Sequence, residues 1–169
     1  PEAIEKIALN TKYNRGPAYE FAPVNDTIYK DGLNTQNALK KMEELSKDDA
    51  PFFLSVGLSK PHLPFTAPKK YWDMYPDSSI KLTEIKERPR NGYKKAIRTG
   101  GELKNYYGMP ELYEEIDDNM ALKLRRAYYA CVSYADAQVG KLVNKLETLG
   151  IRDKTIIVLW GDHGYKLGD

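Results

Sequence analysis

The sequence is poor in the residues that build disulfides and metal clusters. Its 169 residues include one cysteine and two histidines. A single cysteine cannot form an internal disulfide, so a disulfide framework is excluded. Cys131 lies in an apolar stretch with helical periodicity. We interpret it as a buried core thiol, because a free cysteine behaves as a small hydrophobic residue.

Long apolar runs and a strong excess of one charge are also missing. No run approaches the roughly 18 apolar residues that a membrane span requires. The net charge is only +2, which is too small to indicate nucleic-acid binding. No signal peptide is visible. Because the chain opens at Pro1 and not at Met, we expect it to belong to a longer protein, called the parent protein below.

The apolar pattern predicts two helices and two buried strands. The first helix is expected from residue 31 to about residue 46, and the second, which is stronger, from about 119 to 149 with Gly150 as its C-terminal cap. Short apolar runs at 52–57 and 155–160 predict buried strands. This α/β order predicts a largely parallel sheet flanked by helices.

The remaining segments are predicted to be mostly irregular. Residues 1–30 show no clear period and are expected to form a surface segment or loop. Prolines 61, 64 and 68 argue against a regular element around them. The long polar segment from 67 to 118 is expected to hold at most short helices, around residues 71–72 and 111–116.

Four side chains that could take part in binding or catalysis follow the two predicted strands. Lys60 and His62 come after the first strand, and Asp162 and His163 after the second. The carboxyl ends of parallel strands share one edge of a sheet, where α/β proteins bind ligands. Carboxylate and imidazole can hold a metal ion, an imidazole can donate to an anion, and Lys60 adds a point charge. The group therefore favours a metal and anion site, and imidazole favours Zn²⁺, Mn²⁺ or Fe²⁺ over Ca²⁺.

The aspartate and the two histidines also have an ordinary structural interpretation. Asp162 stands between glycine and histidine where a turn is expected, and aspartate is common in turns. His163 is consistent with a loop histidine. His62, between two prolines, is consistent with a structural histidine that donates to a backbone carbonyl. The sequence leaves these alternatives open.

Residues 51–65 contain Lys60-Pro61-His62, and residues 155–169 contain Asp162-His163-Gly164. These two segments together resemble the sulfatase family, and most of all the iduronate-2-sulfatase group. Residues 127–136 are similar to the family's preceding helix, and residues 15–18 and 26–32 also fit. The resemblance implies an alkaline-phosphatase-like α/β fold. Residues 1–169 would then be one part of a catalytic domain, without its N-terminal nucleophile segment and its C-terminal remainder.

The resemblance also implies a chemistry. The family hydrolyses sulfate esters with a formylglycine made from Cys or Ser, and a divalent cation, usually Ca²⁺, holds the sulfate. Asp162 and His163 match cation-site positions, although His163 also fits a place facing the nucleophile. His62 matches the histidine that contacts the ester and helps to protonate the leaving oxygen, and Lys60 matches the lysine of the same motif.

Parts of the family pattern are absent from this chain. It lacks the Cys/Ser-x-Pro/Ala-Ser-Arg motif that carries the formylglycine, and Cys131 does not match it. The paired N-terminal aspartates and a lysine beyond Asp169 are also missing, and Lys166 is too early to be that lysine. We expect the isolated chain to be inactive and to need the remainder of the domain. By resemblance, the parent protein is exported to a periplasmic, extracellular or lysosomal location.

The expected substrate is a sulfated carbohydrate. Aromatic residues of the long segment offer stacking surfaces and its basic residues offer anion contacts; a solvated basic loop with core tyrosines is the alternative. The residues are Tyr71, Trp72, Tyr75, Tyr93, Tyr106, Tyr107, Lys86, Arg88, Arg90, Lys94, Lys95 and Arg98. Two other functions remain open, a phosphate or phosphonate ester hydrolase of the same superfamily and a non-catalytic binder of anionic glycans.

Overall fold

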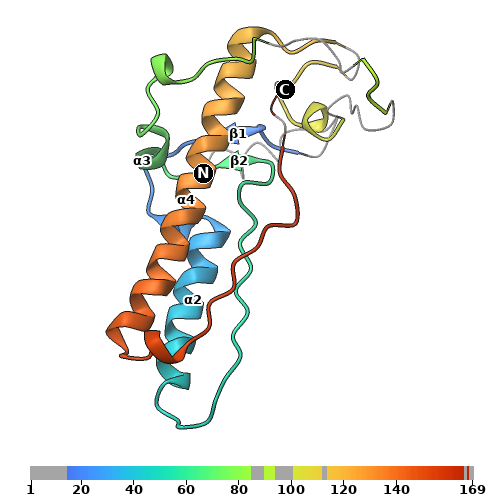
Figure 1. Cartoon of the computed structure of the whole chain (residues 1–169). Helices are drawn as coiled ribbons and strands as arrows, with labels where there is room; N and C mark the ends of the chain where they lie inside the picture. The colour runs from blue at the N-terminus through green and yellow to red at the C-terminus, as the bar shows by residue number, and fades with distance from the viewer. Residues whose placement is uncertain (1–14, 85–89, 94–100, 112–113, 166, 168–169) are drawn as a thin grey trace.

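The computed structural model describes residues 15–84, 90–93, 101–111, 114–165 and 167. Two helices, α2 (Lys30–Leu45) and α4 (Asp118–Thr148), lie side by side along most of the molecule (Figure 1). The short α3 (Lys69–Trp72) packs against α4. The two predicted long helices and the short helix around residues 71–72 are therefore confirmed. In the 111–116 segment the described residues 111 and 114–116 form no helix, and 112–113 lie outside the described residues.

Both ends of α4 are set by local sequence. The Asp117 side chain caps the N-terminus by accepting the N–H of Met120 at 2.8 Å. At the C-terminus, Gly150 adopts a positive φ of 69°, and the N–H of Ile151 returns to the carbonyl of Leu146 at 3.1 Å. A glycine is favoured in this left-handed position, which closes the last turn. The predicted cap at Gly150 is confirmed.

A two-stranded parallel sheet lies beside α4. β1 (Tyr19–Glu20) pairs with β2 (Phe65–Thr66), with Tyr19 opposite Phe65 and Glu20 opposite Thr66. Loop had been expected in both places. The strand fits between the prolines because Phe65 and Ala67 keep their N–H groups, which donate to the carbonyls of Ala18 and Glu20. The connecting segments also contain short 3-10 helices: η1 (Asp26–Ile28), η2 (Asp77–Ser79), η4 (Leu103–Asn105) and η5 (Arg152–Lys154).

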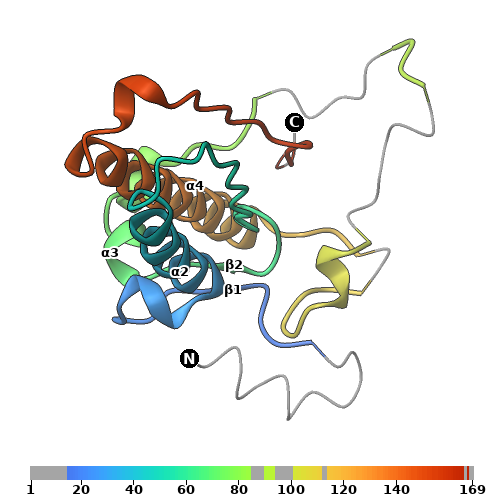
Figure 2. The same ribbon diagram turned by 90° about the horizontal axis from the view of Figure 1, so that it is seen from below.

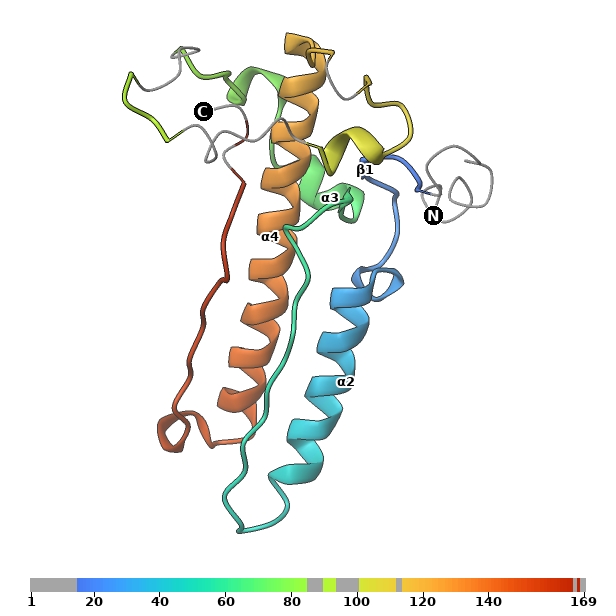
Figure 3. The same cartoon turned by 90° about the vertical axis from the view of Figure 1, so that its right-hand side faces the viewer.

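The two predicted buried strands do not form within this chain. Residues 52–57 and 155–160 are extended and run in the same direction beside the helices (Figure 3), but they form no sheet. Phe53 is 91% exposed and Ile156 is 92% exposed. A strand is completed by backbone hydrogen bonds to a neighbouring strand, and in the described part of the chain no strand pairs with either segment. The Gly57 carbonyl instead accepts the side-chain amide of Asn34 at 3.3 Å. The α/β prediction therefore holds here only as helices with a small parallel sheet.

The core forms where β2 and α3 meet α4. Its central residues include Phe65, Cys131 and Tyr134, and the last two are fully buried. Burial raises the pKa of the Cys131 thiol to about 12, so the thiol stays protonated, and the predicted core thiol is confirmed. Tyr71, Trp72 and Tyr106 are core residues as well, which removes them as stacking surfaces for a sugar.

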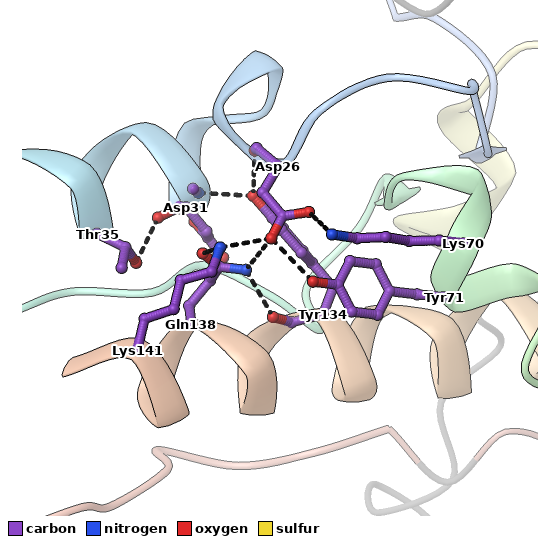
Figure 4. A network of polar contacts seen from close by, with 9 residues as sticks. Asp26, Asp31, Thr35, Lys70, Tyr71, Tyr134, Gln138 and Lys141 are labelled. Carbon is purple, nitrogen blue, oxygen red and sulfur yellow. Dashed lines mark hydrogen bonds and ion pairs between the residues drawn. The ribbon is translucent and has the colours of Figure 1, made fainter. Parts of the chain in front are cut away.

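A buried carboxylate joins η1 to α3 and α4. Asp26 is almost fully buried and accepts hydrogen bonds from Tyr71, Gln138 and Lys141, and it forms an ion pair with Lys70 (Figure 4). Such a buried charge is tolerated because its partners compensate the lost hydration. The network therefore fixes how η1 sits against the two helices.

Gly32 marks a close approach between η1 and α2. A Cβ atom there would lie 2.1 Å from the Asp26 carbonyl oxygen. The Gly32 N–H donates to the Tyr134 hydroxyl at 2.6 Å, and this hydroxyl donates to the Asp26 carbonyl at 2.9 Å. The buried face of α2 thus carries Gly32, Thr35, Ala38 and Met42, while Leu33 is exposed.

Candidate active site

The Lys60-Pro61-His62 turn is held in place by the first turn of α2. The Asp31 carboxylate is buried and accepts the N–H groups of Ser59 and Lys60 at 2.8–3.0 Å, together with the Ser59 hydroxyl at 2.7 Å. Both X–Pro bonds of the segment, before Pro61 and before Pro64, are cis. A carboxylate that accepts several donors is a strong local anchor, so α2 determines where the turn stands.

Lys60 points back into its own turn. Its Nζ donates to the carbonyl oxygens of His62 at 3.0 Å and Pro64 at 2.6 Å. Burial lowers the pKa of the Lys60 ammonium, and the nearby Asp31 carboxylate opposes that effect. The lysine therefore stabilises the turn through these two hydrogen bonds and places its positive charge next to the backbone of His62.

His62 is half-exposed and has a distinct partner on each ring nitrogen. Nδ1 lies 2.8 Å from the Leu63 carbonyl oxygen, so this nitrogen carries a proton and donates. Nε2 lies 3.7 Å from Oε2 of Glu102. The carbonyl contact expected of a structural histidine is present, yet it occupies only Nδ1. The Nε2 face remains available for chemistry.

Asp162 and His163 form an exposed pair in the second loop. Their side chains are 88% and 68% exposed, and the His163 N–H donates to Oδ1 of Asp162 at 2.9 Å. This backbone hydrogen bond and the charge of the His163 ring hold the pKa of Asp162 below its usual range. Within the described ranges, no group of three or more His, Cys, Asp or Glu side chains is arranged to hold a metal ion. The pair thus offers one carboxylate and one imidazole.

Tyr165 joins the two loops. Its ring meets the His62 ring edge-on at 5.9 Å and the Phe65 ring at 5.7 Å between centroids. It also packs at 6.1 Å against Tyr128 of α4. Such edge-to-face contacts stabilise a defined arrangement of rings. His62 and the Asp162-His163 loop are therefore neighbours, although the predicted strands that should have brought them together are absent.

Several residues around His62 were not singled out from the sequence. Tyr165 and Asp31 lie inside segments that resemble a family pattern, but no spacing marked them as contacts. Glu102 carries no sequence signal at all, because it lies 40 positions after His62 in an irregular segment. Figure 2 shows residues 101–111 outside the helix pair, on the same side as the chain leading into β1. Only the three-dimensional structure could place Glu102 beside His62.

The basic and aromatic residues proposed for sugar binding are only partly described. Tyr93 and Tyr107 are exposed, Arg90 is exposed, and Tyr75 is hydrogen-bonded to Ser133 at 2.6 Å. The other basic positions, together with Lys166, lie outside the described residues: Lys86, Arg88, Lys94, Lys95 and Arg98. Among the described helices, none has the length and apolarity of a membrane span.

Several known proteins are similar to this chain in sequence. A sequence model of the family described as Sulfatase matches residues 2–169. This chain belongs to the sulfatase family. It is 33% identical to the iduronate 2-sulfatase of Homo sapiens over 175 residues, which cover 95% of the chain and 32% of that protein. The resemblance to the iduronate-2-sulfatase group is thereby confirmed.

Bacterial sulfatases are similar to the chain as well. A sulfatase of Formosa agariphila is 33% identical over 147 residues, covering 87% of the chain and 28% of that protein. A choline-sulfatase of Rhizobium meliloti is 29% identical over 140 residues, covering 78% of the chain and 26% of that protein. The chain thus spans about a third or less of the length of these sulfatases.

Proposed function

We propose that the parent protein is a sulfuric ester hydrolase that acts on a sulfated carbohydrate. One observation carries the proposal: Tyr165 brings the Asp162-His163 loop against the His62 turn, at 5.9 Å between the His62 and Tyr165 rings. An imidazole beside a carboxylate–imidazole pair is suited to an anionic ester, because it combines a proton donor with potential metal ligands. Membership of the sulfatase family supports the same reaction class.

His62 is proposed as the catalytic residue of this chain. Its Nδ1 is engaged by the Leu63 carbonyl, which fixes the ring and leaves Nε2 to face the reacting ester. When the ring is protonated on both nitrogens, the Nε2 proton can pass to the leaving oxygen as the ester bond breaks, which leaves the neutral ring with its proton on Nδ1. His62 is also proposed to contact the sulfate. Lys60 supports binding through the positive charge that it holds beneath the turn.

Asp162 and His163 are proposed to hold a divalent cation. Both side chains are exposed and adjacent, and carboxylate oxygen and imidazole nitrogen are metal ligands, so the residues fit part of such a site. When bound, the cation would neutralise sulfate charge. The family resemblance favours Ca²⁺, whereas the imidazole favours a transition metal. The remaining ligands would come from other parts of the parent protein.

The nucleophile is proposed to be a formylglycine in a segment outside this chain. The extended segments at 52–57 and 155–160 are then strands of a larger, alkaline-phosphatase-like parallel sheet. Their exposed apolar side chains, such as Phe53 and Ile156, support that placement because they need a covering neighbour. The family resemblance further supports export of the parent protein.

The test uses the parent protein purified from its native source. Peptide mass spectrometry asks whether a Cys or Ser has become formylglycine, and hydrolysis of a sulfated sugar is compared with that of a matched phosphate ester. The proposal predicts formylglycine, preferential sulfate release, and a loss of about 10²- to 10⁴-fold in kcat for His62→Ala. Preferential phosphate release would instead identify a phosphohydrolase, and binding without turnover a glycan-binding relative.

A further inference from the structure

Glu102 lies at the His62 site although it comes from a distant part of the chain. It stands directly before η4, and its Oε2 is 3.7 Å from His62 Nε2. The Tyr165 hydroxyl approaches the same carboxylate oxygen at 3.5 Å. Glu102 therefore contacts both the His62 turn and the residue that joins the second loop to it.

The Glu102 carboxylate is itself held from the other side. The Arg15 guanidinium lies 3.6 Å from Oε1 of Glu102 and 5.0 Å above the Tyr106 ring. A guanidinium that stacks on an aromatic ring and pairs with a carboxylate is restricted in orientation. Glu102 thus has a fixed partner on each oxygen, one toward Arg15 and one toward His62.

The backbone around Glu102 is anchored as well. The Tyr107 N–H donates to the Gly16 carbonyl at 3.0 Å, and Pro17 and Tyr107 form a parallel bridge. Lys104 is buried, and its Nζ donates to the carbonyl of Glu111 at 3.1 Å. These contacts tie the 101–109 segment to the chain that leads into β1, so the position of Glu102 does not depend on its side-chain contacts alone.

We propose that Glu102 is a positioning residue for His62. The Leu63 carbonyl engages Nδ1 of the imidazole and Glu102 faces Nε2, so the two together set the plane of the ring. The proposal rests on the function proposed above, because the ring matters only if it serves the ester. At 3.7 Å the contact is an electrostatic pairing and not a hydrogen bond, so Glu102 can orient the ring while the Nε2 proton stays free for the leaving oxygen.

The ordinary alternative is a surface ion pair between Glu102 and Arg15. Exposed pairs of this kind contribute little, typically about 0–1 kcal/mol to stability, and their loss does not alter a neighbouring imidazole. The two interpretations therefore differ in what happens at His62, and this difference can be measured without relying on turnover.

The experiment uses the parent protein with Glu102→Gln, Glu102→Ala and Glu102→Asp. Glu43→Gln is the matched control, since Glu43 pairs with Lys145 at 2.8 Å near the C-terminal end of α2. His62 reactivity is followed by carbethoxylation with diethyl pyrocarbonate and peptide mass spectrometry. Turnover of a sulfate ester is followed as separate kcat and KM values.

The proposal predicts faster carbethoxylation of His62 in the Gln and Ala variants, and a fall in kcat of up to about 100-fold with little change in KM. Glu102→Asp, which keeps the charge, should retain more kcat than Glu102→Gln, and Glu43→Gln should behave as wild type. Unchanged His62 reactivity, or an unchanged kcat, overturns the proposal. If the wild-type protein releases no sulfate, the proposed function fails, and the carbethoxylation rates alone still decide whether Glu102 holds His62.

Discussion

The Asp31 carboxylate accepts the backbone N–H of Lys60 at 2.8 Å, and so joins the first turn of α2 to the turn that carries His62. Ser59 donates to the same carboxylate through both its N–H and its hydroxyl. Each carboxylate oxygen accepts at least one backbone N–H. The orientation of the candidate catalytic histidine therefore depends on a residue 31 positions earlier in the chain.

Asp31→Asn is expected to weaken this anchor. Whichever way the new amide is turned, its nitrogen faces a backbone N–H that needs an acceptor. A buried donor left without its partner costs about 1–3 kcal/mol, so the free energy of unfolding should fall by that amount. Urea denaturation of the parent protein measures it. Asp49→Asn, at an exposed position, should change it by less than about 0.5 kcal/mol, and equal effects of the two variants would contradict the anchor.

Asp26 is expected to make stability depend on acid. Burial alone would raise the pKa of Asp26, but the ammonium groups of Lys141 and Lys70 hold it well below its usual range. A lowered folded-state pKa stabilises the folded protein fully above the unfolded value of about 3.9, and this contribution is lost as the pH falls below it. Part of the acid unfolding should therefore originate at this one carboxylate.

Asp26→Asn tests that expectation. Lys141 and Lys70 are 42% and 60% exposed and can turn to water, so the cost near neutral pH should be about 1–3 kcal/mol, below that of a fully buried unpaired charge. The difference from wild type should shrink as the pH is lowered from about 5 to about 2. Asp73→Asn, which breaks an exposed pair with Lys69, serves as the control. A difference that stays constant with pH would show that Asp26 does not titrate as proposed.

Alanine substitutions at two glycines of the long helices are expected to change the stability of the protein in opposite directions. At Gly32 the added Cβ would lie 2.1 Å from a backbone oxygen of η1, so the helix must move, and Gly32→Ala should destabilise the protein by more than about 2 kcal/mol. At Gly140 nothing lies within 4 Å of the added atom, so Gly140→Ala should stabilise α4 by about 0.5–1 kcal/mol. Thermal unfolding of both variants measures the contrast. A Gly32→Ala variant as stable as the wild type would mean that α2 and η1 are not in close contact.

The long helices could be predicted because their signals are local. Apolar residues recur at three- and four-residue steps along α4, and Gly150 marks its end, so the pattern needs no knowledge of the rest of the protein. The same pattern could not show that Gln138 is fully buried. That burial depends on Asp26, which lies 112 positions away in the chain.

The strands and most contacts of the site could not be predicted, because they depend on segments that are distant in the sequence. Residues 52–57 have the composition of a buried strand, yet a strand exists only when another segment supplies hydrogen bonds, and composition cannot name that segment. His62, Asp162 and His163 could be selected because each follows such a run. Glu102 could not, since its only relation to His62 is spatial. How Lys60 is used was equally hidden, because the carbonyls of His62 and Pro64 that it binds belong to an irregular turn.

Lysine substitutions in the exposed segments 52–57 and 155–160 are expected to benefit the isolated chain and to destabilise the parent protein. Phe53 and Ile156 are almost fully exposed here, and apolar surface of this kind favours association. In the isolated chain, Phe53→Lys and Ile156→Lys should reduce self-association and dye binding. If these segments are strands of the larger sheet, the same substitutions in the parent protein bury a charge and should lower the unfolding midpoint strongly. Tyr93→Lys, at an exposed position outside both segments, should alter neither measurement. An unaltered unfolding midpoint for Ile156→Lys in the parent protein would mean that residues 155–160 stay uncovered there, and the larger parallel sheet would then have to be built without them.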